Sequence, residues 1–199
     1  MPVRKRYEIL DSLPAYGPMY IPVTGTGDTH FYSEGYVVRF FKSGGGEWVA
    51  NFAPGWSGCS GVYDFPGHDR TIVIAGGFGY VMSPEREVPF FTFGYDIRDM
   101  IPMENGSMVC SGQSSVILVD AEAGELWISE RISWDGITGL KLEGVTLTGL
   151  SYDPTNANDE WVPFSVNLKT RTIEGGSYRI SLELNSRKQD FKETVYTIW

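Results

Sequence analysis

The sequence predicts an all-β fold, a propeller-like arrangement of short antiparallel β-repeats. One sequence pattern occurs twice. Residues 64–76 align with residues 100–112 at an offset of 36 without a gap, and their prolines and glycines are in register. A period of this length indicates one structural unit used several times. Gly (24 residues) and aromatics (14%) are frequent, as in chains rich in strands and tight turns. A β-sandwich or barrel is the alternative, because three copies and a leading hairpin are few for a closed ring.

The first elements lie ahead of the repeat. Residues 4–13 fit either a short helix or an edge strand that ends before Pro14. Residues 14–30 are dense in proline and glycine but hold several aromatics, which predicts an ordered, extended cover. A hairpin follows, with strands at 36–41 and 47–52 and a turn at the three glycines 44–46.

The repeat copies predict about four short strands each. In the second copy, Asn105-Gly106 predicts a type I′ hairpin turn, since both residues tolerate positive φ. A third, degenerate copy runs from Gly136 to Gly176, and its alignment requires about ten extra residues between 151 and 161. Alternation over 178–184 and the β-branched segment 194–199 predict two final strands.

These elements predict one domain. A chain of 199 residues that is 42% hydrophobic can bury a single core. We expect a single all-β domain over 1–199, with repeat units at roughly 31–61, 62–97, 98–134 and 135–178 and with C-terminal strands at 178–199.

Composition and charge limit the kinds of partner, location and cofactor that we expect. The net charge of -9 argues against nucleic acid as a partner and fits a basic protein partner, while solubility alone accounts for an acidic balance as well. The basic start of the chain leads into no long apolar segment, so we expect neither a signal peptide nor membrane contact, and a cytoplasmic location. Cys59 and Cys110 have no metal-ligand or redox spacing, so we expect free thiols and neither metal nor cofactor.

No catalytic motif is present in the sequence. His68 lies near Asp64 and Asp69, which suggests an acid/base pair, but its alignment with a turn residue of the second copy favours a solvent-facing position. Whether the protein is an enzyme therefore stays open at this point.

The predicted partner-binding residues lie in loops. The extra segment of the third copy is rich in oxygen ligands, and such loops often form the binding face of repeat proteins, although a calcium site or a plain solvated loop fits too. Two tryptophans in loop-like surroundings are further candidates, with loop packing as the alternative. The predicted residues are Trp56, Trp134, Asp135, Asp153, Asn156, Asn158, Asp159 and Glu160. By contrast, Trp48, Trp127 and Trp161 are assigned to the core.

The segments Ser129–Ile137, Gly149–Pro154 and Trp161–Leu168 resemble a group of functionally uncharacterised bacterial β-propeller-like repeat proteins. The resemblance extends over most of the chain and implies a propeller-like repeat and a bacterial origin. Some small proteins of this kind are immunity partners of secreted toxins. By that analogy we expect a non-enzymatic, cytosolic immunity protein that neutralises a basic toxin. The alternatives are a carboxylate-dependent hydrolase at a propeller-like channel and a structural scaffold module.

Overall fold

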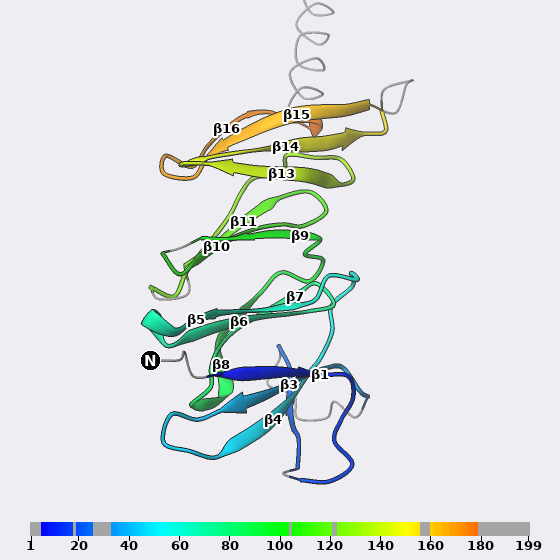
Figure 1. The fold of residues 1–199 in the computed structure, drawn as a ribbon. Helices are drawn as coiled ribbons and strands as arrows, with labels where there is room; N and C mark the ends of the chain where they lie inside the picture. Colours follow the sequence, from blue (N-terminus) through cyan, green and yellow to red (C-terminus); the bar gives the residue numbers. More distant parts are fainter. Residues whose placement is uncertain are drawn as a thin grey trace, which may run out of the picture. The chain divides into compact units, whose positions relative to one another are not determined.

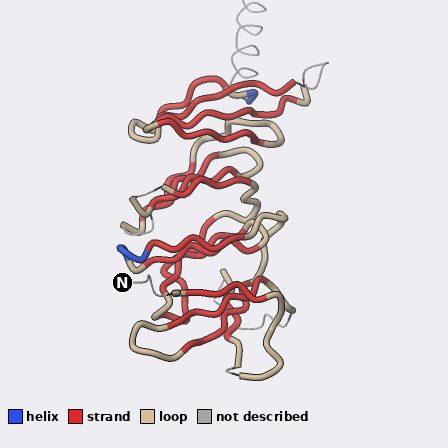
Figure 2. Tube along the Cα trace, in the orientation of Figure 1, coloured by secondary structure: helices blue, strands red, loops and turns tan. Residues whose placement is uncertain are grey.

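The computed structural model describes residues 5–17, 19–25, 33–103, 105–120, 123–155 and 160–178. These residues form four four-stranded sheets in chain order (Figures 1 and 2). The predicted all-β, propeller-like class of fold, with short antiparallel sheets repeated along the chain, is confirmed. The predicted strand at 194–199 lies outside the described residues, as does almost all of the one predicted at 178–184.

The first sheet contains β1 (Tyr7–Leu10), β2 (Ile21–Val23), β3 (Tyr36–Phe41) and β4 (Glu47–Phe52) in the order β1-β3-β4-β2. The predicted hairpin is β3–β4, with the predicted bounds. Of the two structures that fitted residues 4–13, the edge strand is the one observed, antiparallel to β3. The predicted extended cover contributes β2, which pairs with β4 in parallel.

The second and third sheets correspond to the two clear repeat copies. The second contains β5 (Gly61–Phe65), the short 3-10 helix η1 (Pro66–His68), β6 (Arg70–Ala75), β7 (Phe78–Ser83) and β8 (Arg86–Phe93). The third contains β9 (Asp99–Pro102), β10 (Ser107–Ser111), β11 (Val116–Asp120) and β12 (Glu125–Ile128). In each, strands that are consecutive in the chain are neighbours in the sheet.

The turn between β9 and β10 differs from the prediction. Gly106 has a φ of 82° and donates its N–H to the carbonyl of Met103, so Gly106 closes the turn and is not one of its two central residues. The predicted type I′ turn has Asn105 and Gly106 as its central residues, so the predicted turn type is wrong. In the second sheet Asp69 occupies the same turn position, with a φ of 48° and a hydrogen bond from its N–H to the carbonyl of Pro66, although the sequence alignment pairs Asp69 with Asn105.

The fourth sheet contains β13 (Ile137–Glu143), β14 (Thr146–Asp153), β15 (Glu160–Asn167) and β16 (Thr172–Gly175), again in chain order. Part of the predicted insertion belongs to strands. Ser151, Tyr152 and Asp153 pair with Val162, Trp161 and Glu160, so the extra residues lengthen β14 and β15. Residues 156–159 at the tip lie outside the described ranges.

The chain divides into two compact units. The first contains Met1–Cys110 and Leu118–Trp127, and the second contains Ser111–Ile117 and Ile128–Trp199. The single domain expected from the length stays a prediction. The first unit contains a core made by the first two sheets, in which bulky side chains such as Phe40, Phe52 and Tyr80 are fully buried. Each such side chain contributes roughly 1.5–3 kcal/mol, more than a surface ion pair does.

Candidate protein-docking face

The central hairpin of the fourth sheet has one buried and one open face. Along β14, buried residues at odd positions alternate with exposed or half-buried residues at even positions. Successive side chains of a strand point to opposite faces, so one parity forms the core and the other faces outward. We call the face that carries Thr148, Leu150, Tyr152, Trp161 and Pro163 the outer face of this sheet.

An apolar row lies on the outer face. Leu150 pairs with Pro163, and Tyr152 pairs with Trp161 one step further along the same two strands. The rings of Tyr152 and Trp161 have their centroids 5.3 Å apart. Leu150 is 39% exposed and Trp161 is 46% exposed, although side chains of these types are usually buried. The core position predicted for Trp161 is therefore wrong. Trp161 pairs with Tyr152, and paired residues of neighbouring strands point to the same face of a sheet, so its ring lies on the outer face.

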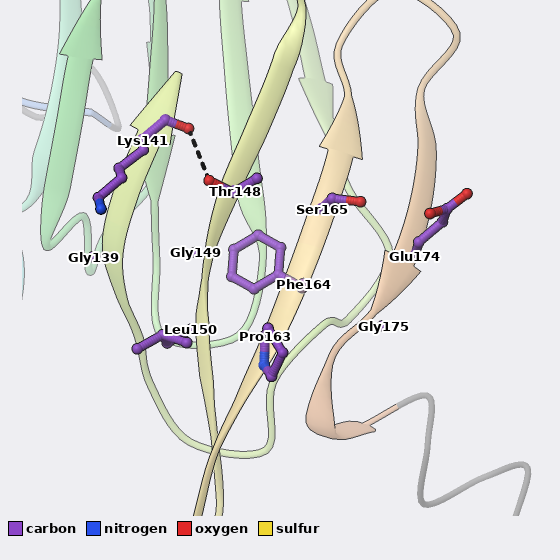
Figure 3. Close-up of a pocket in the computed structure, with 10 residues that line it drawn as sticks. All are labelled: Gly139, Lys141, Thr148, Gly149, Leu150, Pro163, Phe164, Ser165, Glu174 and Gly175. Carbon is purple, nitrogen blue, oxygen red and sulfur yellow. Dashed lines mark hydrogen bonds between the residues drawn. The ribbon is translucent and has the colours of Figure 1, made fainter. Parts of the chain in front are cut away.

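A shallow depression of about 680 Å³ continues from this row over all four strands of the sheet (Figure 3). Leu150 and Pro163 belong both to the row and to the lining of the depression. The other lining residues are glycines, small polar residues, one buried ring and two charged residues: Gly139, Gly149, Gly175, Thr148, Ser165, Phe164, Lys141 and Glu174.

Glycine keeps parts of this lining free of side chains. Gly139 (φ 64°) lies where the β13–β14 register shifts, and Gly175 (φ 74°) lies at the end of β16. Gly149 pairs with Phe164, and a Cβ there would come within 2.8 Å of that ring. A bare backbone at these positions permits the packing of Phe164 in the core and leaves the outer surface shallow.

The charged residues of the depression come from opposite edges of the sheet. Lys141 lies on β13 and Glu174 on β16, and Figure 3 shows them on either side of Phe164, Leu150 and Pro163. The hydroxyl of Thr148 donates to the Lys141 carbonyl at 3.5 Å. An apolar centre between polar margins is the usual composition of a protein interface.

The predicted binding segment adjoins this face. Asp153 is the last residue of β14 and is 8% exposed. Its carboxylate accepts bonds from the Thr155 N–H at 2.9 Å and the Thr155 hydroxyl at 2.6 Å, which makes a local turn. Glu160, exposed, is the first residue of β15. The predicted residues Asn156, Asn158 and Asp159 lie outside the described ranges.

The predicted residues Trp134 and Asp135 lie in a loop of the same unit that is fixed by many contacts. The Trp134 ring is half-buried and packs edge-on against Tyr178 at 4.7 Å. Arg131 lies over both rings and donates to the carbonyls of Ser133 and Trp134. Asp135 is exposed and accepts a bond from the side chain of Gln113. These contacts give both residues a structural role, and their predicted role in binding stays a prediction.

The predicted residue Trp56 belongs to the other unit and is 88% exposed. Of the other tryptophans, Trp48 is buried as predicted, and its indole N–H donates to the carbonyl of Pro84 at 2.8 Å. Trp127 is half-buried on β12. Within the second unit, the structure brings the β14–β15 candidates Asp153 and Glu160 together as a cross-strand pair.

His68 lies beside carboxylates that are paired with an arginine. His68 is half-buried, and its ring packs against the turn at Gly106. Its neighbour Asp69 accepts a hydrogen bond from Arg6 at 2.6 Å, and the Arg6 guanidinium also forms an ion pair with Asp64 at 3.2 Å. Within the described ranges no group of three or more His, Cys, Asp or Glu residues is placed to hold a metal ion.

The carboxylates with a perturbed pKa have a lowered pKa, which does not suit a general acid. A side-chain hydrogen bond from Lys5 lowers the pKa of Glu8, and a backbone hydrogen bond from Ser43 lowers the pKa of Glu85. A general acid needs a raised carboxyl pKa instead. No described helix is long and apolar enough to cross a bilayer.

Comparisons with known proteins give a fold likeness only. No family model matches the chain, and no curated protein is similar to it. The N-terminal domain of Nup159 has 11% identity and a TM-score of 0.43, with 61% of this chain and 34% of that chain covered. A complex of S. cerevisiae Dbp5 with Nup159, Gle1, IP6 and ADP gives 11% identity, a TM-score of 0.42, and coverage of 62% and 34%. The chain thus spans about a third of the length of these chains.

The residues that define the outer face were not found from the sequence. In β14 and β15, apolar residues occur at both parities, so period-2 alternation does not show which face is buried. One sequence signal could have located this face: Tyr152 and Trp161 stand near the two ends of the extra segment of the third copy. Aromatic residues on both sides of a loop suggest a cross-strand pair.

Proposed function

We propose that the protein is a non-enzymatic protein-binding module and that the outer face of the β13–β16 sheet is its docking face. The observation that carries the proposal is the row of exposed Leu150, Trp161 and Pro163 with half-buried Tyr152, continuous with the shallow depression. Exposed apolar surface with an aromatic anchor and polar margins is typical of interaction sites.

The partner that the charge favours is a basic protein. The net charge of -9 attracts a positively charged surface and speeds encounter with it. Neutralisation of a basic bacterial toxin in the cytoplasm is the specific form of this proposal. It is supported by the charge and by the resemblance noted for Ser129–Ile137 and its companion segments.

The test uses a basic secreted protein encoded beside the gene as the partner. Binding is measured by calorimetry for the unaltered protein and for the double variant Leu150→Ser, Trp161→Ala. We expect the dissociation constant to rise at least about tenfold, because truncation of central apolar anchors typically costs more than about 1 kcal/mol each. The matched control is Val88→Ser, an exposed apolar residue of β8 that is 59% exposed in the other unit.

Two results separate the parts of the proposal. If the double variant binds as tightly as the unaltered protein, the outer face is not the docking face. If binding depends on the outer face but the partner's toxicity is unaffected, protein binding stands and the immunity role fails.

A further inference from the structure

Trp56 and Tyr95 form an exposed aromatic pair in the first unit. Trp56 is 88% exposed and Tyr95 is 51% exposed, and their ring centroids are 6.1 Å apart with 42° between the planes. Exposed tryptophan is unusual, because the indole buries a large apolar area when covered. The pair is therefore a candidate contact site.

Backbone bonds hold the loop that carries Trp56. Gly55 donates to Ala75 at 2.9 Å, Trp56 to Tyr95 at 2.8 Å and Ser57 to Gly76 at 2.8 Å. Gly55 also lies in a position where a Cβ would collide with three backbone atoms. The loop consequently lies directly on the turn between β6 and β7, and Trp56 is presented by ordered backbone.

One face of the Tyr95 ring is held by Phe78. It stacks on Phe78 with centroids 4.4 Å apart and 9° between the planes, and Phe78 packs on the buried Tyr80 at 4.7 Å. A ring supported in this way loses little conformational entropy when a ligand covers its other side. The pair is thus preorganised for contact with a flat or charged group.

The same protein shows what such a pair binds. Arg131 lies 5.2 Å from the centroid of the Trp134 ring and 4.9 Å from that of Tyr178, so one guanidinium contacts a Trp–Tyr pair. Arg70 and Arg86 lie 3.8 and 4.2 Å from the ring centroid of Phe90. Among the described residues, no cation lies over Trp56 or Tyr95 in this manner.

Charge favours a cation at the pair. The segment that follows Tyr95 contains Asp96 and Asp99 with one opposing charge, Arg98, and the whole chain carries a net charge of -9. Guanidinium binds an aromatic face through the ring quadrupole and is less strongly hydrated than ammonium. We propose that Trp56 and Tyr95 form an open arginine-binding pair that receives an arginine side chain of a basic partner protein. This contact is independent of the outer face of β13–β16.

The experiment follows the indole N–H signals of the six tryptophans by NMR. Trp56→Phe identifies the Trp56 signal by its loss. The full-length protein is titrated with the peptide acetyl-Gly-Arg-Gly-amide and, separately, with the same peptide containing citrulline, which is neutral and of similar shape. We expect a saturable shift of the Trp56 signal with the arginine peptide only. The Trp134 signal is the internal control, because Arg131 already lies over that ring.

A second variant tests the pair. Tyr95→Leu keeps an apolar contact with Phe78 but removes the ring, and we expect the dissociation constant for the arginine peptide to rise about threefold. The five other indole signals report whether this variant is folded. The proposal is overturned if the Trp56 signal does not move, if citrulline moves it equally, or if folded Tyr95→Leu binds as the unaltered protein does.

Discussion

At Gly106, backbone conformation and a neighbouring side chain both exclude a Cβ. The residue has a φ of 82°, and a Cβ would lie 2.8 Å from Cδ2 of His68. The positive φ closes the β9–β10 turn, while the contact joins it to the turn after η1. One glycine thus serves the local hairpin and the packing of two neighbouring turns.

Gly106→Ala is expected to lower the free energy of unfolding by about 2 kcal/mol, since an alanine here combines strained φ with a clash. Urea denaturation measures the loss. Adding His68→Ala should restore only the part due to the clash. Gly44→Ala is the matched control, because Gly44 has neither positive φ nor an atom within 4 Å of a Cβ, and it should change stability by less than about 0.5 kcal/mol. Equal effects at both glycines would contradict this explanation.

Whether a side chain is buried could be predicted from the sequence where most residues of its strand share one environment. Trp48 lies on β4, in which five consecutive residues are buried, and its core position follows from the apolar run. Trp161 lies on β15, whose first four residues are exposed or half-buried and whose last four alternate between buried and half-buried, and its side was decided by pairing with Tyr152. Pairing register is a tertiary property that a single strand does not encode.

Strand β1 is fastened to the second sheet by Arg6. The guanidinium contacts Asp64 at 3.2 Å and Asp69 at 2.6 Å, and its side chain is only 17% exposed. Asp64 also accepts from Thr71, and Asp69 accepts from Ser83. A partly buried network of this kind is worth more than an exposed ion pair, because its loss leaves carboxylates without their cation.

Arg6→Ala is expected to destabilise the protein by about 2 kcal/mol in chemical denaturation, and Asp64→Asn in the same chain should reduce that cost. Lys5→Ala is the control at the neighbouring residue, because the Lys5–Glu8 pair is exposed and should contribute less than about 1 kcal/mol. If both variants lose the same small amount, Arg6 does not fasten β1.

Elements were predicted well where turn residues and β-branched runs coincide, as in β3 and β4. The third repeat copy was harder. Its extra residues were expected in a loop, yet part of them extends β14 and β15, because Tyr152 and Trp161 form a cross-strand aromatic pair. Alignment locates extra residues in the sequence but does not show whether they pair.

Two buried groups of the first unit, Cys110 and Tyr80, are expected to make the stability of the protein sensitive to alkali. Burial raises the pKa of the Cys110 thiol above its ordinary 9.0, and burial raises the pKa of the Tyr80 phenol above its ordinary 10.0. Tyr80 also donates to the carbonyl of Ala53 at 2.7 Å. The unfolded chain therefore releases these protons at lower pH than the folded protein does.

Stability should be complete below about pH 9 and decrease as pH rises, by up to about 1.4 kcal/mol per pH unit for each such group. Unfolding free energies at pH 7, 9 and 10.5 measure this slope. Cys110→Ala should flatten it from pH 9 and Tyr80→Phe from pH 10, although each variant is less stable at pH 7. A slope unchanged in both variants would show that other groups control alkaline unfolding.

At the scale of the molecule, composition predicts a class of partner but does not locate the surface that would bind it. Net charge is a property of the whole chain, and it favours a basic partner without locating one. The candidate site depends on which strand faces remain open, and this is decided by sheet packing. Only the association of the site with the third copy was accessible from the sequence, through the extra residues at 151–161.

The order β1-β3-β4-β2 has a consequence for synthesis. Both outer strands of the first sheet come from the first 23 residues, and the central hairpin follows them. On the ribosome, these flanking strands emerge before the hairpin to which they bind. Loss of residues 1–25 would deprive the hairpin of both neighbours, and two bare strand edges invite association with other chains.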